Sequence, residues 1–153
     1  MRKILICLPV ILVLFTVFGE LHAYRSATPA EAKAMAEKAV KYLESQGHEK
    51  AFEQFERSQG PFRTDDLYVF VLNSNGEMMA HGGSPKMVGK LNVEWTDPDG
   101  KPFVRKIVDV ARTKGSGWVE YRWTNLATNK VRQKKTYFVR TGDFIVCCGA
   151  YTD

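Results

Sequence analysis

Three aromatic residues and a lysine near the end of the chain have the chemistry of a small-molecule site. Residues 115–139 read as two strands joined by a polar loop, with Tyr121 and Trp123 on the first strand and Lys135 and Tyr137 on the second. Charged residues alternate with Tyr121 and Trp123, so these two aromatic rings are expected to point inward. A lysine aligned with them is costly to bury unless an anion or a hydrogen-bond acceptor lies beside it. Two interpretations remain: a pocket for a small anionic or polar molecule, or a strand core in which Lys135 reaches water at the sheet edge.

Other residues lack the spacing of a metal site. The histidines His22, His48 and His81 show no ligand spacing. The pattern Asp97-x-Asp99-Gly100 resembles the start of a calcium loop, but Val108 stands where the bidentate carboxylate is needed. We therefore interpret this pattern as a turn, and expect neither a metal ion nor another cofactor.

Catalysis also finds little support in the sequence. Ser84 lies close to His81, but its Gly-Ser-Pro context lacks the strand, turn and helix of a nucleophile elbow. Cys147 and Cys148 are neighbours, so a strand would point them to opposite faces and could not aim both at one ion. We expect two small apolar residues in a terminal strand, and a protein that is not an enzyme and has no catalytic residues.

The N-terminus has the composition of a secretory signal. Met1-Arg2-Lys3 precedes an apolar run of 15 residues, 4–18, that is broken only by Pro9 and Thr16. A spanning helix needs about 20 apolar residues, so the run is short for a permanent anchor. We expect residues 1–23 to be a signal peptide that is cleaved after Ala23, and a periplasmic or secreted protein. Leu21 is less usual than alanine at its position, so an uncleaved N-terminal membrane anchor is the alternative.

Residues 24–153 have the length of one domain. Removal of the signal leaves 20 of the 22 basic residues and 16 of the 17 acidic residues, so the charge of the mature chain is near +4. The charges are interspersed and form no basic block, which makes nucleic acid a poor candidate partner.

The hydrophobic pattern predicts an α+β fold. Thr28, Pro29 and Glu31 form a capping signal for a helix that ends near residue 45, and a second helix covers about 48–57. Strands are expected at 67–72 and 77–81, then a long connection, a helix at about 101–114, and strands at 118–124, 134–140 and 144–151. The three turn-linked strands at the end suggest an antiparallel sheet with helices packed to one side.

The order of short motifs resembles a single Cache domain of the second type, an extracytoplasmic sensor module of bacterial chemoreceptors and sensor kinases. The resemblance covers about 28–151, and its pieces are Asp66-Leu67-Tyr68-Val69-Phe70-Val71, Asn75-Gly76, Ala80-His81, Val88-Gly89-Lys90, Asp97-x-Asp99-Gly100-Lys101, Gly115-x-Gly117-Trp118-Val119-x-Tyr121-x-Trp123, Lys135-x-Tyr137 and Gly149-Ala150-Tyr151.

The resemblance implies a PAS-like fold, with a central antiparallel sheet of about five strands and a long N-terminal helix packed on it. It implies a pocket for a small organic acid or related metabolite between the sheet and its connecting loops. In this pocket Lys135 would form an ion pair with the carboxylate of the ligand. The implied ligand-binding residues are Tyr68, His81, Met87, Leu91, Tyr121, Trp123, Lys135 and Tyr137.

Two departures from the family bear on function. Gly82 follows the histidine where the family commonly has proline, and the chain reaches Asp153 without a kinase or methyl-accepting region. We therefore expect a stand-alone binding or sensing module that presents its ligand to a separate membrane receptor or sensor kinase. The alternative is a structural or protein-interaction module with a pocket filled by its own side chains, which forms a homodimer through an apolar patch on the first helix.

Overall fold

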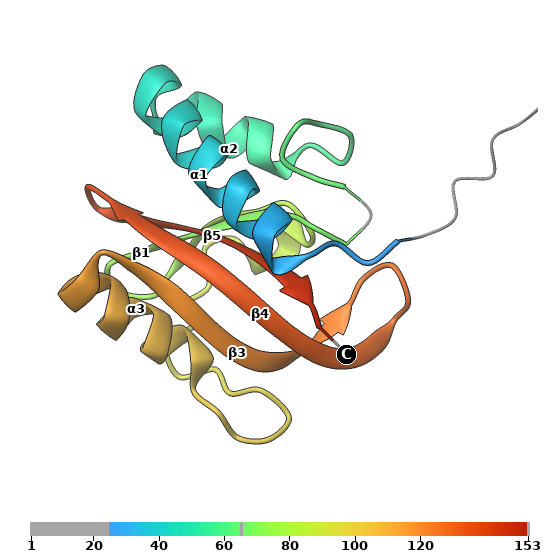
Figure 1. Cartoon of the computed structure of the whole chain (residues 1–153). Helices are drawn as coiled ribbons and strands as arrows, with labels where there is room; N and C mark the ends of the chain where they lie inside the picture. Colours follow the sequence, from blue (N-terminus) through green and yellow to red (C-terminus); the bar gives the residue numbers. More distant parts are fainter. Residues whose placement is uncertain (1–24, 65, 153) are drawn as a thin grey trace, which may run out of the picture.

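The protein is built on one five-stranded antiparallel sheet with helices on both faces (Figure 1). The computed structural model describes residues 25–64 and 66–152. The strand order is β2-β1-β5-β4-β3, so the three C-terminal strands lie side by side and β2 and β3 form the edges. The strands are β1 (Val69–Asn73), β2 (Met78–His81), β3 (Ser116–Asn125), β4 (Lys130–Thr141) and β5 (Phe144–Tyr151). The predicted α+β class, the antiparallel sheet and its hairpins are confirmed.

The first helix begins where its capping signal predicts. Helix α1 (Pro29–Gln46) has Thr28 as its N-cap, whose Oγ1 accepts a hydrogen bond from the backbone N–H of Glu31. The Glu31 carboxylate in turn accepts from the backbone N–H of Thr28, which completes the capping box. The predicted long N-terminal helix packed on the sheet is therefore confirmed. Helix α2 (His48–Glu56) follows after Gly47, a 3-10 turn η1 (Pro85–Met87) interrupts the long connection, and α3 (Phe103–Lys114) precedes the last three strands.

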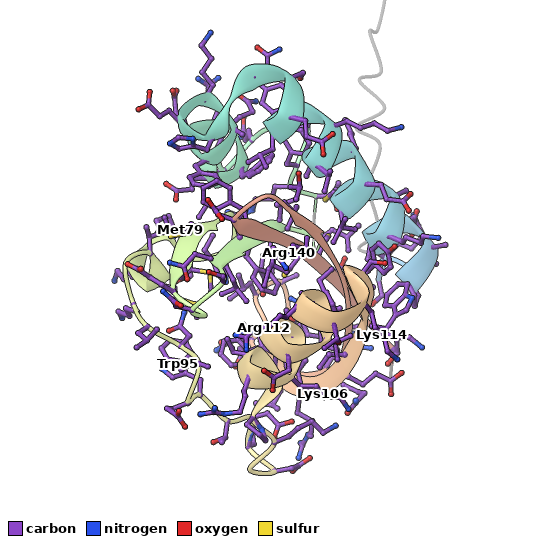
Figure 2. The ribbon with its side chains drawn as sticks, turned by 90° about the vertical axis from the view of Figure 1, so that its left-hand side faces the viewer. Met79, Trp95, Lys106, Arg112, Lys114 and Arg140 are labelled. Atoms are coloured by element: carbon purple, nitrogen blue, oxygen red, sulfur yellow. The ribbon has the colours of Figure 1, made fainter. Side chains whose placement is uncertain are left out.

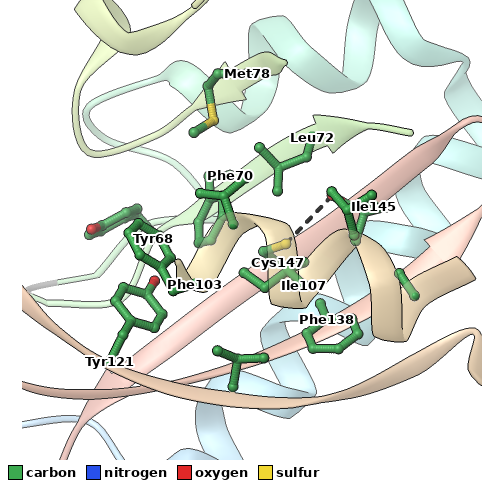
Figure 3. Close-up of a cluster of buried hydrophobic side chains, with 14 residues drawn as sticks. Tyr68, Phe70, Leu72, Met78, Phe103, Ile107, Tyr121, Phe138, Ile145 and Cys147 are labelled. Atoms are coloured by element: carbon green, nitrogen blue, oxygen red, sulfur yellow. Dashed lines mark hydrogen bonds between the residues drawn. The ribbon is translucent and has the colours of Figure 1, made fainter. Parts of the chain in front are cut away.

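The helices cover both faces of the sheet, which corrects the expectation that they lie on one side. Helices α1 and α2 lie on one face, against alternate residues of β1 and β5 such as Val69 and Val146. Helix α3 lies on the other face, against Phe70 and Phe138 (Figure 3). The continuous apolar run of β1 is explained by this arrangement, because both of its faces are covered.

Strand β4 begins four residues earlier than expected. The Oδ1 atom of Asn125 accepts hydrogen bonds from the backbone N–H groups of Ala127 and Thr128, and Asn129 adopts a positive φ of 55°. These contacts compress the predicted loop into a tight turn, since asparagine tolerates the left-handed region and can cap its own turn. The register is thereby fixed at Asn125 opposite Lys130, and Tyr121 is placed opposite Lys134.

The turn at Asp97 is anchored to the edge strand β3. One carboxylate oxygen of Asp97 accepts from the backbone N–H groups of Asp99 and Lys101, and the other accepts from the N–H of Arg122 in β3. The Nζ atom of Lys101 donates to the backbone carbonyl of Glu120 at 2.7 Å. Asp97 is therefore a structural residue, in agreement with the predicted turn.

The expected signal peptide, residues 1–23, lies outside the described residues. Among the residues that are described, none of the helices has the length and apolar character needed to cross a membrane.

The capping box yields a stability prediction. We expect Thr28→Ala to lower the free energy of unfolding by about 1 kcal/mol, because it leaves the N–H of Glu31 without its acceptor. Urea denaturation measures this change. The exposed Thr128→Ala is the control, with an expected effect within about 0.5 kcal/mol. A Thr28→Ala value equal to that of the control would contradict the role of the cap.

Candidate ligand-binding site

A fully buried lysine lies at the centre of the site. Lys134 is 0% exposed, and its Nζ atom donates a hydrogen bond of 2.8 Å to the hydroxyl of Tyr68. The ammonium also lies over the rings of Tyr68 and Tyr151, at 4.0 and 5.1 Å from their centroids. Within the described part of the chain Lys134 has no ion-pair partner. Burial lowers the pKa of this lysine, because the protein interior penalises the charged form.

The neighbours of Lys134 come from three adjacent strands. Tyr121 lies opposite Lys134 on β3, and Tyr151 lies opposite it on β5. The hydroxyl groups of Tyr121 and Thr136 are hydrogen-bonded at 3.0 Å. Tyr151 donates its hydroxyl to the backbone carbonyl of Thr124 at 2.7 Å. Burial raises the pKa of the phenols of Tyr68 and Tyr121, so they remain neutral donors.

Gly149 makes room for the lysine stem. A Cβ atom at this position would lie 2.7 Å from Cε of Lys134 and 2.2 Å from Oγ1 of Thr136. Neither distance is compatible with van der Waals contact, so a side chain at Gly149 would displace the lysine or the threonine.

His81 is held as a neutral imidazole. Its Nδ1 atom accepts hydrogen bonds from the backbone N–H groups of Gly83 and Ser84, at 3.1 and 2.8 Å. Burial lowers its pKa to about 3, and the positive charges of Lys134 and Arg63 act in the same direction. A neutral imidazole with an accepting Nδ1 carries its proton on Nε2. His81 therefore has a fixed orientation and a hydrogen-bond donor at Nε2.

A small cavity of about 20 Å³ lies beside these polar groups. A volume of this size holds roughly one water molecule. The ring of Tyr121 stacks on that of Phe103, with centroids 4.1 Å apart, which closes the cavity toward α3. The lining residues are Phe70, Met78, His81, Met87, Trp95, Phe103, Val104, Tyr121 and Trp123.

The structure brings five of the eight residues named from the sequence together. His81, Met87, Tyr121 and Trp123 line the cavity. Tyr68 lies with its ring centroid 5.0 Å from that of His81 and its hydroxyl on Lys134, so it links the cavity to the buried ammonium.

Three of the eight lie elsewhere. Lys135 is on the opposite face of β4, where it pairs with Glu120 at 3.0 Å, and Tyr137 shares that face and packs against Trp118. The expectation that Lys135 and Tyr137 share a face with Tyr121 is wrong, because the observed register places Tyr121 opposite Lys134. Leu91 is 62% exposed and lines an outer groove instead of the cavity.

Lys134, which the sequence did not single out, is the immediate neighbour of Lys135, which it did. Adjacent residues of a strand point to opposite faces, so an error of one position in the register exchanges Lys134 and Lys135. Phe138 indicates which face of this strand is buried, because it is wholly apolar and shares its face with Lys134. Tyr137 is a weaker indicator, because tyrosine occurs on both buried and exposed faces. Thr136, two residues from Lys134 on the same face, was missed for the same reason.

The two cysteines follow the simpler expectation. Cys147 is buried among the side chains packed against α3, and Cys148 is buried among those packed against α1. Both are free, and burial raises the pKa of the Cys148 thiol to about 12. In the described part of the chain no group of histidine, cysteine and acidic residues could hold a metal ion.

Comparison with known proteins identifies the family. The model of the family "Single Cache domain 2" matches residues 19–153. The chain belongs to this family. A curated relative, the sensor histidine kinase MctS of Rhizobium johnstonii, is 27% identical to this Cache domain over 90 residues. The match covers 58% of this chain and 19% of the kinase, so the chain spans only about a fifth of that relative.

Solved structures show the same fold. One is a Cache chemosensory domain studied for its recognition of carboxylic acids, with a TM-score of 0.69, 22% identity, and coverage of 81% of this chain and 92% of the other. A methyl-accepting chemotaxis protein of Vibrio parahaemolyticus gives the same TM-score and identity, and covers 81% of this chain and 88% of the other. The PAS-like Cache fold expected from the sequence is therefore confirmed.

The close packing at Gly149 in this Cache domain can be tested by adding one methyl group. We expect Gly149→Ala to destabilise the domain by about 1–3 kcal/mol, because the new Cβ overlaps Lys134 and Thr136. Urea denaturation measures the loss. Gly60→Ala is the matched control, since its Cβ would meet no atom closer than 3.5 Å. Equal stability of the two variants would show that the strand relaxes without cost.

The neutral His81 predicts a pH-dependent stability. The unfolded chain protonates this imidazole near pH 6.5 and the folded domain near 3, so the unfolded state binds more protons between these values. The free energy of unfolding should therefore fall as the pH decreases below 6.5, by up to about 1.4 kcal/mol per pH unit.

The variant His81→Asn isolates this contribution, because its side-chain oxygen can still accept from Gly83 and Ser84 but does not titrate. Urea denaturation from pH 7 to 5 should give a difference between wild type and variant that changes with pH. A constant difference would exclude His81 as the titrating group.

Proposed function

We propose that this domain is an extracytoplasmic sensor module that binds a small carboxylate next to Lys134. The family assignment supports the sensor role, because the matched curated relative is a sensor kinase and structural neighbours come from chemotaxis proteins. The single observation that carries the ligand class is the buried ammonium of Lys134, which forms no ion pair with a carboxylate of the described residues and has only the more distant Asp66 as a compensating negative charge.

A carboxylate would meet the electrostatic need of this site. A buried charge is stable only when it is paired and hydrogen-bonded, and the polar partners of the Lys134 ammonium are phenols, which carry no negative charge. A ligand carboxylate would accept a charge-assisted hydrogen bond from Nζ, which is stronger than a bond between neutral groups. The neutral phenol of Tyr68 and Nε2–H of His81 are further donors on the same side.

The size of the cavity favours a short acid. The volume of about 20 Å³ is smaller than a ligand of two or three carbon atoms requires, so binding must displace side chains. Met87 and Trp95, half-buried residues of the long connection between β2 and α3, form part of the wall. We infer that these two side chains move outward to admit the ligand, while the wall formed by β3 stays in place.

The same small cavity supports a second candidate function. A domain of this fold in which the aromatic side chains fill the pocket would act as a structural or interaction module. This alternative predicts that no small carboxylate stabilises the domain.

The family assignment also bears on the signalling partner. We propose that a sensor kinase or chemoreceptor reads the ligand state of the domain, in line with the relatives found. The ligand would act on this partner by shifting the domain between its closed form and a form with the connection displaced.

Lys134 gives the decisive test of carboxylate binding. We expect acetate or propionate to raise the melting temperature of the wild-type domain, compared with chloride at equal ionic strength. At a ligand concentration one hundred times Kd, the stabilisation is about 2.7 kcal/mol. Lys134→Met should abolish this shift because it removes the ammonium.

Lys135→Met is the matched control, because it alters the neighbouring lysine on the opposite face. It should retain the shift of the wild type. A shift that survives in Lys134→Met would remove Lys134 from the binding site. A wild-type domain that no acid of the panel stabilises would favour the self-filled module.

A further inference from the structure

An outer groove runs along α3, on the side of the β1–β2 turn. It consists of two adjoining hollows of about 690 and 250 Å³ that share Ser74, Val108 and Arg112. The larger hollow also contains Leu91, and the smaller one extends to Arg140 at the end of β4. Neither hollow includes a residue of the buried cavity.

Arg112 stands out among the arginines that the structure describes. Seven of the eight, 25, 57, 63, 105, 122, 132 and 140, donate a hydrogen bond to a carboxylate, a carbonyl or a hydroxyl group. Arg112 has no hydrogen-bond or ion-pair partner in the described part of the chain. It nevertheless lies where the two hollows meet, with its guanidinium available to a ligand.

A second guanidinium borders the same groove. Arg140 donates to the backbone carbonyl of Gly142 through Nε at 3.2 Å, which leaves its two Nη groups unused by the described residues. Figure 2 shows Arg112 and Arg140 on one face of the molecule, together with Lys106 and Lys114. Helix α3 carries four basic residues and one acidic residue, a net charge of +3. The lining of the groove itself balances Arg105, Arg112 and Arg140 against Glu77, Asp109 and Asp143, so it suits one carboxylate between two guanidinium groups instead of a strongly acidic partner.

The larger hollow adds an exposed apolar contact. Leu91 is 62% exposed, yet it pairs with Glu77 through a backbone bridge, and the neighbouring N–H of Asn92 donates to Gly76. Its backbone is thus held by the β1–β2 hairpin. A fixed exposed leucine that lines the same hollow as an unpaired arginine is typical of a protein interface, where arginine is enriched and apolar anchors fill shallow hollows.

We propose that this groove is a docking site for a segment of a partner protein with one acidic side chain. The carboxylate of the segment would lie between Arg112 and Arg140, and an apolar side chain would rest against Leu91. Asp109, Glu77 and Asp143 also border the groove, which disfavours a strongly acidic stretch and suits backbone N–H donors. The proposal is independent of the ligand at Lys134.

Peptide titration tests the docking site. The probes are acetyl-Leu-Ser-Ala-Glu-Ala-amide and its glutamine counterpart, added to the ¹⁵N-labelled domain. The glutamate peptide should shift the amide signals of Ser74, Val108 and Arg112, and the glutamine peptide should bind at least about tenfold more weakly. Arg112→Gln should weaken binding of the glutamate peptide by a similar factor.

Lys106→Gln is the matched control, because it removes the same charge from the same helix outside the groove. It should change the affinity by less than about twofold, since exposed charges outside a contact act weakly. Equal losses of peptide affinity in Arg112→Gln and Lys106→Gln would show that binding depends only on the overall positive charge of the helix. This result would overturn the proposal. Equal shifts with sodium acetate at the same concentration would identify a simple anion site and would also overturn it. Lys134→Met should bind the peptide like the wild type, which separates this test from that of the buried site.

Discussion

Burial of the Lys134 ammonium is the constraint on which the site depends. An ammonium without a counter-charge is among the most costly groups to place in a protein interior. The surrounding residues reduce this cost in ways that are visible in the structure. The phenol of Tyr68 accepts its hydrogen bond, two aromatic rings offer their electron-rich faces, and Gly149 leaves the space for its stem. These contacts hold the ammonium in place without an ion pair to a carboxylate of the described residues, and the proposed ligand site rests on this feature.

The two faces of the sheet differ in chemical character. On the face of α1 and α2, small and branched side chains such as Ala36 and Val146 form an apolar core, beside which the buried carboxylate of Asp66 accepts from the N–H of Ala27. On the face of α3, the same sheet carries Lys134 and Thr136 among aromatic rings. The close packing of this apolar layer supports the strands that carry the polar groups on the other face. The connection between β2 and α3 closes the site and is the part that contributes half-buried side chains such as Trp95.

The sequence was sufficient to predict the helices and strands, but not the register in which β3 and β4 pair. Thr28 and Glu31 defined the start of α1 because capping is a local interaction between residues three apart. The apolar run at 67–72 predicted the first strand for an equally local reason. The choice between Lys134 and Lys135 depended on the turn at Asn125, whose compact form results from side-chain hydrogen bonds and one positive φ. When the length of a turn is uncertain, the sequence does not show which residues of the next strand point to each face of the sheet. Tyr68 and Tyr121 were therefore identified correctly, but Lys135 was chosen in place of Lys134.

The anchoring of the Asp97 turn on β3 also affects how the domain can contact other protein molecules. An edge strand presents unpaired backbone groups that can template pairing with another chain, and β3 is ten residues long. Asp97 occupies the N–H of Arg122, and Lys101 occupies the carbonyl of Glu120. Two of the outward-facing backbone groups in the middle of this edge are therefore already used within the molecule. The turn therefore hinders β3 from pairing with an edge strand of another molecule.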